Sequence, residues 1–115
     1  MIVDVEVLRE LCQSVLVDRD LDEVDAHMVT DVLIEAELRG RPTHGVIRLP
    51  GIAERVSEGA RAPMLLAKDG PAYALIDGQE NLGYLVAHRC ARTAIGKADR
   101  SGVGVVGAFN TGHSG

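Results

Sequence analysis

The chain has 115 residues, which is enough for one domain or for part of a larger one. Its hydrophobic content of 46% is normal for a packed core and argues against wholesale disorder. The net charge is −5, and the only aromatic residues are two tyrosines and one phenylalanine. These values argue against nucleic acid as a partner, because phosphates would be repelled and few rings could stack on bases.

The N-terminal sequence Met1-Ile2-Val3-Asp4 lacks the basic region and apolar run of a signal peptide. No apolar run approaches the length of a membrane span. Cys12 and Cys90 fall in apolar helical patterns and form no metal-ligand or redox spacing. We therefore expect a cytoplasmic protein with two small buried thiols and no membrane partner.

Two amphipathic helices are predicted in the first forty residues. Apolar residues at three- and four-residue intervals indicate a first helix over residues 4–17, with Asp4 as its N-cap. A second helix, capped by Asp20 or Asp22, should run to about Arg39 and end at Gly40. The predicted apolar stripe of this second helix is Val24, Met28, Val32 or Ile34, and Leu38.

Three residues of the second helix, Glu23, His27 and Asp31, fall at successive four-residue steps, a spacing that could face a metal ion. The rest of that face is equally acidic, and such triplets commonly form ion pairs on helix surfaces. We predict ion pairing there and no metal site.

The segment Thr43-His44-Gly45-Val46-Ile47-Arg48 combines two groups suited to chemistry on a small organic acid. The imidazole can titrate near neutral pH and transfer a proton, and the guanidinium offers a planar fork that matches a carboxylate. If the four-residue spacing lies on a helical turn, both groups project from one face. The alternative is that His44 is a surface or capping residue and Arg48 a solvated charge.

A third helix is predicted directly after this segment, from Leu49 to Gly59, because Pro50 is comfortable only near a helix start. Its inward residues would be Ile52 and Val56. On this interpretation the segment lies on the turn leading into the helix, where the positive end of the helix dipole favours an anionic ligand.

The second half of the chain predicts a βαβ unit. An apolar run over 64–67 and an Asp-Gly turn precede a strand over 72–76, a helix over 82–99 and a strand over 103–109. The connection should be right-handed and the two strands parallel. The predicted fold class is therefore α/β, with N-terminal helices followed by a βαβ unit.

The run Gly102-Val103-Gly104-Val105-Val106-Gly107 spells the dinucleotide-binding fingerprint in an unsuitable context. The fingerprint follows a strand and opens a helix, whereas these glycines follow a helix and enter a strand. We interpret them as small residues that let another backbone approach closely. A second candidate histidine, His113, follows in the glycine-flanked segment 110–115.

Taken in order, these segments resemble the N-terminal part of the type 2 malate/L-lactate dehydrogenase family. That family also includes ureidoglycolate dehydrogenase, sulfolactate dehydrogenase and the cyclic ketimine reductases. The resemblance covers nearly all of the chain. The residues that carry it are Thr43 to Val46 with Arg48, Pro50 and Gly59, Leu75 to Gly78 with Leu82 and Gly83, and Gly102, Val103 and Asn110 to His113.

The resemblance implies a dehydrogenase fold that differs from the Rossmann fold. It also implies an enzyme that interconverts a 2-oxo acid and a 2-hydroxy acid, or reduces a cyclic imino acid, with NAD or NADP. It also implies that Arg48 binds the substrate carboxylate, that His113 is the catalytic acid/base, and that His44 is a second active-site histidine. Hydride arriving at a carbonyl carbon leaves charge on the oxygen, which an imidazolium can protonate near neutral pH.

Members of this family continue well beyond residue 115 and are commonly homodimers. We therefore expect residues 1–62 to form an N-terminal helical region and residues 63–115 to begin the α/β cofactor and substrate domain. Most cofactor-binding residues would then lie in later segments, and the chain alone should be inactive.

Two functions of other classes stay open at this point. One is a truncated, non-catalytic helical and βαβ association module, in which apolar surface on the last strand and on the alanine-rich helix would mark an interface. The other is a small-anion-binding domain that uses Arg48 without redox chemistry.

Overall fold

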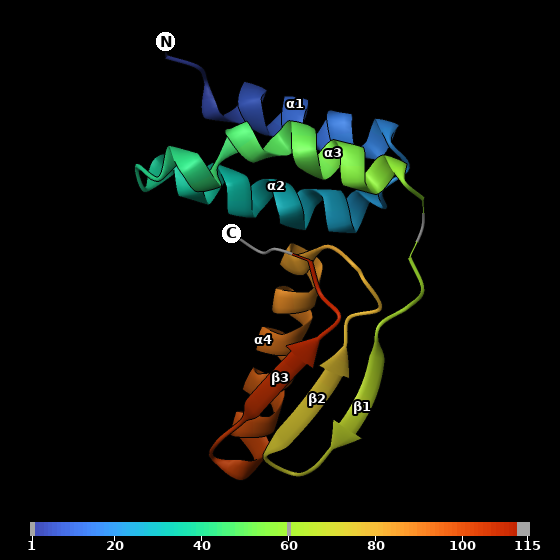
Figure 1. Ribbon diagram of the computed structural model, residues 1–115. Helices are drawn as coiled ribbons and strands as arrows, with labels where there is room; N and C mark the ends of the chain where they lie inside the picture. The colour runs from blue at the N-terminus through green and yellow to red at the C-terminus, as the bar shows by residue number, and fades with distance from the viewer. Residues whose placement is uncertain (1, 60, 113–115) are drawn as a thin grey trace. The chain divides into compact units, whose positions relative to one another are not determined.

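The computed structural model describes residues 2–59 and 61–112, and the chain folds into two compact units, residues 1–60 and 61–115 (Figure 1). The first is helical, and the second contains a sheet and one helix; we call them the helical unit and the α/β unit. The predicted class, with N-terminal helices followed by a βαβ unit, is confirmed. No helix within the described residues is both long and apolar enough to cross a membrane.

Three α-helices form the helical unit: α1 (Val5–Asp18), α2 (Glu23–Leu38) and α3 (Leu49–Ser57). Asp4 caps α1, because its side chain accepts hydrogen bonds from the backbone N–H groups of Glu6 and Val7. Asp22 caps α2 in the same way, and the chain leaves this helix through Gly40 at φ +71°. The predicted caps and the predicted helix ends are confirmed to within two residues.

The core of the helical unit is formed by small and aliphatic side chains: Cys12, Leu16, Ala26, Val29, Leu33, Ile34, Leu49, Ile52 and Ala53. The stripe predicted for α2 is correct at Ile34, the alternative to Val32, and wrong at two exposed positions, Val24 and Leu38. The buried face of α2 contains Ala26, Val29, Thr30, Leu33 and Ile34. These residues recur at three- and four-residue intervals, so the helix carries two apolar stripes and the prediction followed the exposed one.

The α/β unit contains β1 (Leu65–Asp69), β2 (Tyr73–Asp77), α4 (Gly83–Ser101) and β3 (Val105–Phe109), with sheet order β1-β2-β3. β2 and β3 pair in parallel, as predicted for the two strands of the βαβ unit. β1 pairs antiparallel with β2 and was not predicted as a strand. The buried Lys97 of α4 bonds to the side chain of Asp69 and to the carbonyl oxygen of Gly70, which ties the β1–β2 turn to the helix.

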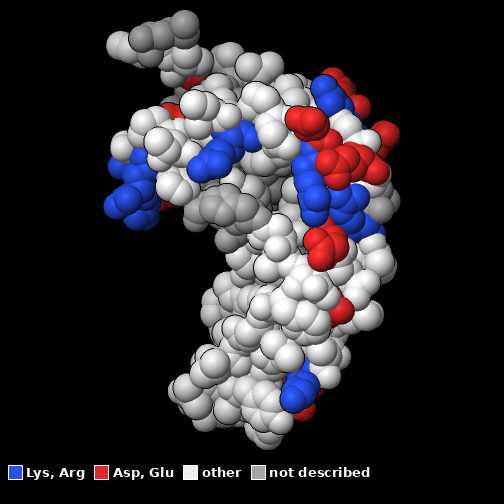
Figure 2. Space-filling view, viewed as in Figure 1, with Lys and Arg blue, Asp and Glu red and all other residues white. Residues whose placement is uncertain are grey.

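One face of this sheet has no cover among the described residues of the α/β unit. Ala74 and Ile76 of β2 are buried on the side where α4 packs. On the other side Tyr73 and Val105, which are paired in register, are 54% and 65% exposed. The surface over the three strands is mostly uncharged, whereas charged side chains gather over the helical unit (Figure 2). The exposed apolar surface expected on the last strand is therefore present.

Candidate active site

The segment that carries His44 and Arg48 folds as two consecutive 3-10 turns, η1 (Pro42–His44) and η2 (Val46–Arg48). Gly45 separates them with φ −96° and ψ −145°, so the premise of a single helical turn is wrong. η2 leads directly into α3, and both candidate residues lie, as predicted, on the turn that enters this helix.

Local hydrogen bonds hold both candidate side chains. Oγ1 of Thr43 lies 3.1 Å from Nδ1 of the half-buried His44. The Nε–H group of Arg48 donates to the carbonyl oxygen of Thr43 over 2.8 Å. No described residue accepts a hydrogen bond from the two terminal amino groups of Arg48. This exposed guanidinium is thus anchored at Nε and can offer its terminal N–H groups to a planar anion.

Glu37, which sequence reasoning missed, contacts this segment from α2. Its Oε1 accepts a hydrogen bond from the backbone N–H of Val46 over 2.9 Å. A Cβ atom added to Gly45 would lie 2.2 Å from the same Oε1, so the carboxylate occupies the space beside that glycine. The contact joins residues nine positions apart, a spacing that matches no helix or strand period and therefore leaves no signal in the sequence.

The second candidate histidine, His113, lies outside the described residues, but the loop that leads to it is held at its base by Asp77. This carboxylate accepts hydrogen bonds from the backbone N–H of Gln79 over 3.0 Å and from Nδ2 of Asn110 over 3.1 Å. Nε2 of Gln79 donates to its other oxygen over 2.8 Å. The bonds from Gln79 and Asn110 lower the pKa of Asp77, with the backbone N–H of Gln79 as the largest cause.

Backbone hydrogen bonds join this loop to the turn that follows β2. The N–H of Glu80 donates to the carbonyl oxygen of Asn110 over 2.9 Å, and the N–H of Gly112 donates to that of Asn81 over 3.2 Å. Both loops therefore lie at the carboxyl ends of the parallel strands β2 and β3, the edge where open α/β sheets bind ligands. The expected meeting of His44, Arg48 and His113 in one cleft stays a prediction.

The glycine run at the end of α4 does not form a phosphate-binding loop. Gly102 ends the helix at φ +84°, and a Cβ atom on Gly104 would lie 2.2 Å from the carbonyl oxygen of Ala94. The run then enters β3 and opens no helix. Close backbone approach is thus the correct interpretation of Gly104, and this run does not fit the phosphates of a dinucleotide.

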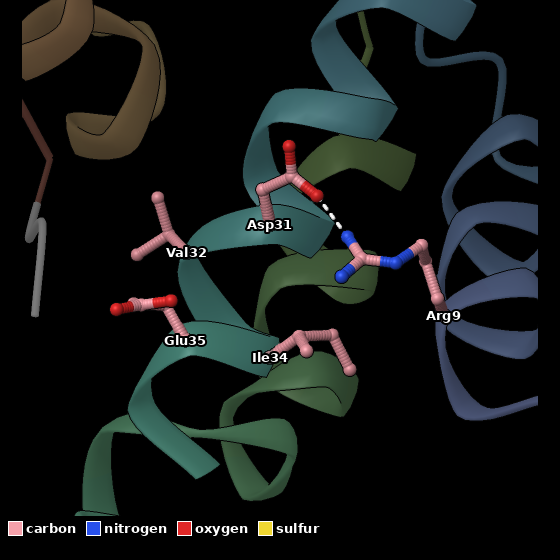
Figure 3. Close-up of a pocket in the computed structure, with 5 residues that line it drawn as sticks. All are labelled: Arg9, Asp31, Val32, Ile34 and Glu35. Carbon is pink, nitrogen blue, oxygen red and sulfur yellow. Dashed lines mark hydrogen bonds and ion pairs between the residues drawn. The ribbon is translucent and has the colours of Figure 1, made fainter. Parts of the chain in front are cut away.

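The helical unit also has a depression of about 500 Å³ between α1 and α2, lined by Arg9, Asp31, Val32, Ile34 and Glu35. Arg9 and Asp31 extend toward each other from the two helices and form an ion pair (Figure 3). Nε2 of His27 lies 3.2 Å from Oδ2 of Asp31. The ion pairing predicted for this face is confirmed by the Arg9–Asp31 pair. Within the described ranges, no group of three or more His, Cys, Asp or Glu residues could hold a metal ion.

Residues 3–115 match the family model described as malate/L-lactate dehydrogenase. The chain belongs to this family. It is 40% identical to a malate dehydrogenase of Pyrococcus horikoshii, over 88% of the chain and 29% of the relative. It is 35% identical to the ureidoglycolate dehydrogenase (NAD(+)) of Escherichia coli strain K12, over 96% of the chain and 32% of the relative.

A solved structure, also of malate dehydrogenase from Pyrococcus horikoshii, superimposes on the whole chain with a TM-score of 0.95 and 37% sequence identity. The match covers 34% of that protein. The chain therefore spans about a third of the length of the relatives it matches. The predicted family is confirmed, and the chain corresponds to one part of a longer dehydrogenase fold.

Proposed function

We propose that the complete protein containing this chain is an NAD- or NADP-dependent oxidoreductase that interconverts a 2-oxo acid and a 2-hydroxy acid. The observation that carries this proposal is the family match over residues 3–115, which includes all three candidate residues. The names of the relatives support the substrate class and the cofactor, since one is a malate dehydrogenase and another is named for NAD(+). Segments outside this chain would supply the rest of the enzyme, so the 115 residues alone should be inactive.

Arg48 binds the substrate carboxylate in this proposal. Its anchored Nε and its terminal amino groups, which no described residue engages, support the role, because a guanidinium can form two parallel hydrogen bonds to one carboxylate. Arg48 directly precedes α3, so the partial positive charge at the start of this helix lies next to it along the chain and also favours an anion. The carboxylate of the substrate would thus be fixed while the neighbouring carbon reacts.

His113 donates and accepts the proton at the substrate oxygen, and His44 assists as a second active-site histidine. Reduction turns a carbonyl oxygen into a hydroxyl group, so a proton donor must stand at that oxygen. The contact between Nδ1 of His44 and the hydroxyl group of Thr43 leaves Nε2 as the ring atom that can face substrate. Both roles come from the family resemblance, and the contact of His44 with Thr43 supports the role of His44.

A nicotinamide cofactor supplies the hydride when it is bound. The glycine run at the end of α4 does not fit its phosphates, so we propose that the cofactor is held mainly by segments beyond residue 115. The choice between NAD and NADP would then also depend on those segments.

Arg48→Lys and His113→Ala in the complete protein test the assigned roles. Arg48→Lys should raise KM for the 2-oxo acid by about tenfold or more, because the fork is lost and a hydrogen bond to a charged group contributes about 1.5–3 kcal/mol. His113→Ala should lower kcat by about a hundredfold to ten-thousandfold, the usual contribution of a general acid. Both are measured from the consumption of NADH or NADPH with a panel of 2-oxo acids.

Arg39→Lys and His27→Ala are the matched controls, because Arg39 pairs with Glu35 at the surface and the exposed His27 contacts only Asp31 among the described residues. They should leave kcat and KM unchanged. Normal kinetics in both Arg48→Lys and His113→Ala would show that the roles are wrongly assigned. A complete wild-type protein that binds neither NADH nor NADPH would overturn the proposed function itself.

We also propose that the complete protein is a homodimer in the cytoplasm. The dimer rests on the family resemblance. The cytoplasmic location is supported by Cys12 and Cys90, which are both free thiols as expected in a reducing compartment. Sedimentation of the complete protein at the mass of one chain would contradict the dimer.

A further inference from the structure

The hydrogen bond from Val46 to Glu37 connects two elements that the proposed reaction does not otherwise link. Glu37 lies in the last turn of α2, and Val46 is the first residue of η2, between His44 and Arg48. The bond is 2.9 Å long and partly buried. A side chain of α2 is therefore fixed to the backbone between the two candidate active-site residues.

Helix stability does not account for a carboxylate at this position. The C-terminal end of a helix carries partial negative charge, which disfavours an acidic side chain, and no basic residue lies in the last turn of α2. Among the described residues, no Lys, Arg or His forms an ion pair with Glu37. The interaction that satisfies this half-buried carboxylate lies outside its own helix, at the N–H of Val46.

The Glu37 carboxylate occupies the space beside Gly45. An added Cβ atom would lie 2.2 Å from Oε1, 2.6 Å from Cδ and 2.9 Å from Cγ of Glu37. A larger residue at this position would require the end of the Glu37 side chain to shift from its place beside Val46.

The two 3-10 turns depend on contacts that cross their junction. The backbone bond from Gly45 to Pro42 closes η1, and the bond from Arg48 to Gly45 closes η2. Each of these bonds closes a single turn, so neither fixes the orientation of η1 relative to η2. The bond from Arg48 Nε to Thr43 crosses the junction, and the bond from Val46 to Glu37 holds the junction itself to α2.

We propose that Glu37 is a positioning residue for the dehydrogenase reaction: its hydrogen bond to Val46 N–H sets the relative orientation of His44 and Arg48. The proposal rests on the function proposed above. What matters is an acceptor oxygen at this distance, because a hydrogen bond to a fixed N–H requires an oxygen within reach and does not require a negative charge. Loss of the acceptor lets the junction move, and misplacement by about 1 Å can lower catalysis about a hundredfold.

Three substitutions of Glu37 in the complete protein separate these effects. Glu37→Ala removes the acceptor, and Glu37→Asp shortens the side chain by one methylene group, so both should lower kcat/KM by about tenfold to a hundredfold. Glu37→Gln keeps an oxygen at the same distance and should stay within about fivefold of wild type, because a neutral acceptor forms a weaker bond. Glu35→Gln is the matched control, since this exposed carboxylate of α2 pairs only with Arg39 among the described residues and should leave kcat/KM unchanged.

Amide hydrogen exchange gives a second measurement that does not depend on activity. The amide of Val46 should exchange faster in Glu37→Ala, while its protection should persist in Glu37→Gln and in Glu35→Gln. The amide of Leu33, in the buried core of the helical unit, should keep its protection in every variant. A change confined to Val46 and its neighbours would separate a positioning role from general loss of structure.

A double-substitution cycle with Gly45→Ala tests the same contact from the other side. Gly45→Ala should lower kcat/KM about as much as Glu37→Ala, because the new Cβ atom displaces the carboxylate. Together the two changes should cost little more than either one, because the side chain shortened by Glu37→Ala leaves room for the new methyl group. Fold-changes that simply multiply would show that the two residues act independently and would count against the proposal.

The outcomes separate this proposal from the proposed function. Full activity in Glu37→Ala, or an equal loss in Glu37→Gln and Glu37→Ala, overturns the positioning role while the dehydrogenase stands. Unchanged exchange at Val46 in Glu37→Ala does the same. A wild-type protein with no NADH- or NADPH-dependent activity on 2-oxo acids overturns the proposed function and, with it, any role of Glu37 in that reaction.

Discussion

The helical unit and the α/β unit each place a carboxylate at the base of a segment that leads to a candidate active-site residue, but they use it differently. Glu37 accepts one hydrogen bond, from a backbone N–H nine residues further along the chain. Asp77 accepts three, two from Gln79 and one from Asn110 in the loop after β3. Glu37 thus accepts one hydrogen bond from the turn with His44 and Arg48, whereas Asp77 accepts three at the base of the loop before His113.

The two units also differ in how completely they bury their apolar surface. Leu16, Val29 and Leu33 of the helical unit are fully buried, whereas the burial pattern of β3 shows one half-buried residue and four exposed ones. A sheet with one bare apolar face is stable only when something else covers it. The helical unit should therefore be the more self-sufficient of the two.

The largest effect expected from this difference is at Leu33. Leu33→Ala should lower the free energy of unfolding by about 2–5 kcal/mol, because a fully buried leucine leaves a cavity. Val105→Ala, on the bare face of the sheet, should change it by no more than about 0.5 kcal/mol. Urea unfolding followed by far-ultraviolet circular dichroism measures the first. Tyrosine fluorescence measures the second, since both tyrosines, Tyr73 and Tyr84, lie in the α/β unit.

Equal losses in these two variants would contradict the contrast between a closed core and a bare sheet. They would indicate that Val105 is buried in the folded 115-residue chain. A larger loss for Val105→Ala in the complete protein than in the 115-residue chain would show that segments beyond residue 115 cover this face.

A smaller effect is expected where α4 meets β3. Gly104→Ala should lower the free energy of unfolding of the α/β unit by about 1–3 kcal/mol, because the added methyl group would overlap the backbone carbonyl of Ala94. Gly107→Ala is the matched control on the same strand, where the nearest atom would be Cδ1 of Leu75 at an ordinary 3.4 Å. Tyrosine fluorescence during urea unfolding reports both, and a Gly104 variant as stable as the Gly107 variant would show that α4 can move away from the strand.

The sequence predicts features that follow from neighbouring residues. Asp4 and Gly40 mark a helix start and a helix end through local backbone chemistry, so both were placed correctly. The parallel pairing of β2 and β3 follows from a strand, helix and strand pattern that admits few topologies. His44 and Arg48 stand out because their side-chain chemistry suits an acid substrate wherever they lie in the fold.

Features that depend on the distance between segments left no local signal. The contact between Glu37 and Val46 exists because α2 and the following turn come together, and no residue pattern encodes that approach. The buried face of α2 was misplaced because the helix has apolar residues on two faces, and only packing against neighbouring helices decides which face is buried. Both features become visible only when the packing partner is known.

The smallest effect we predict is a pH dependence of opposite sign in the two units. The pKa of Asp77 is lowered in the fold, so this group stabilises the α/β unit above its unfolded pKa of about 3.9 and stops doing so as the pH falls through the lowered value. Asp77→Asn should therefore be less stable than wild type at neutral pH, and the difference should shrink as the pH falls below about 4.

Asp25, in the first turn of α2, provides the opposite case. Burial and the nearby charge of Asp22 raise its pKa, so its ionisation destabilises the helical unit as the pH rises through the raised value. Asp25→Asn should be more stable than wild type at neutral pH, and the gain should vanish in acid. Urea unfolding across this pH range, followed by tyrosine fluorescence for Asp77→Asn and by circular dichroism for Asp25→Asn, measures both. Hydrogen bonds stabilise ionised Asp77, whereas burial and the charge of Asp22 disfavour ionised Asp25, so stability should depend on pH with opposite slopes at the two sites. Stability changes of the same sign in the two variants would contradict this contrast.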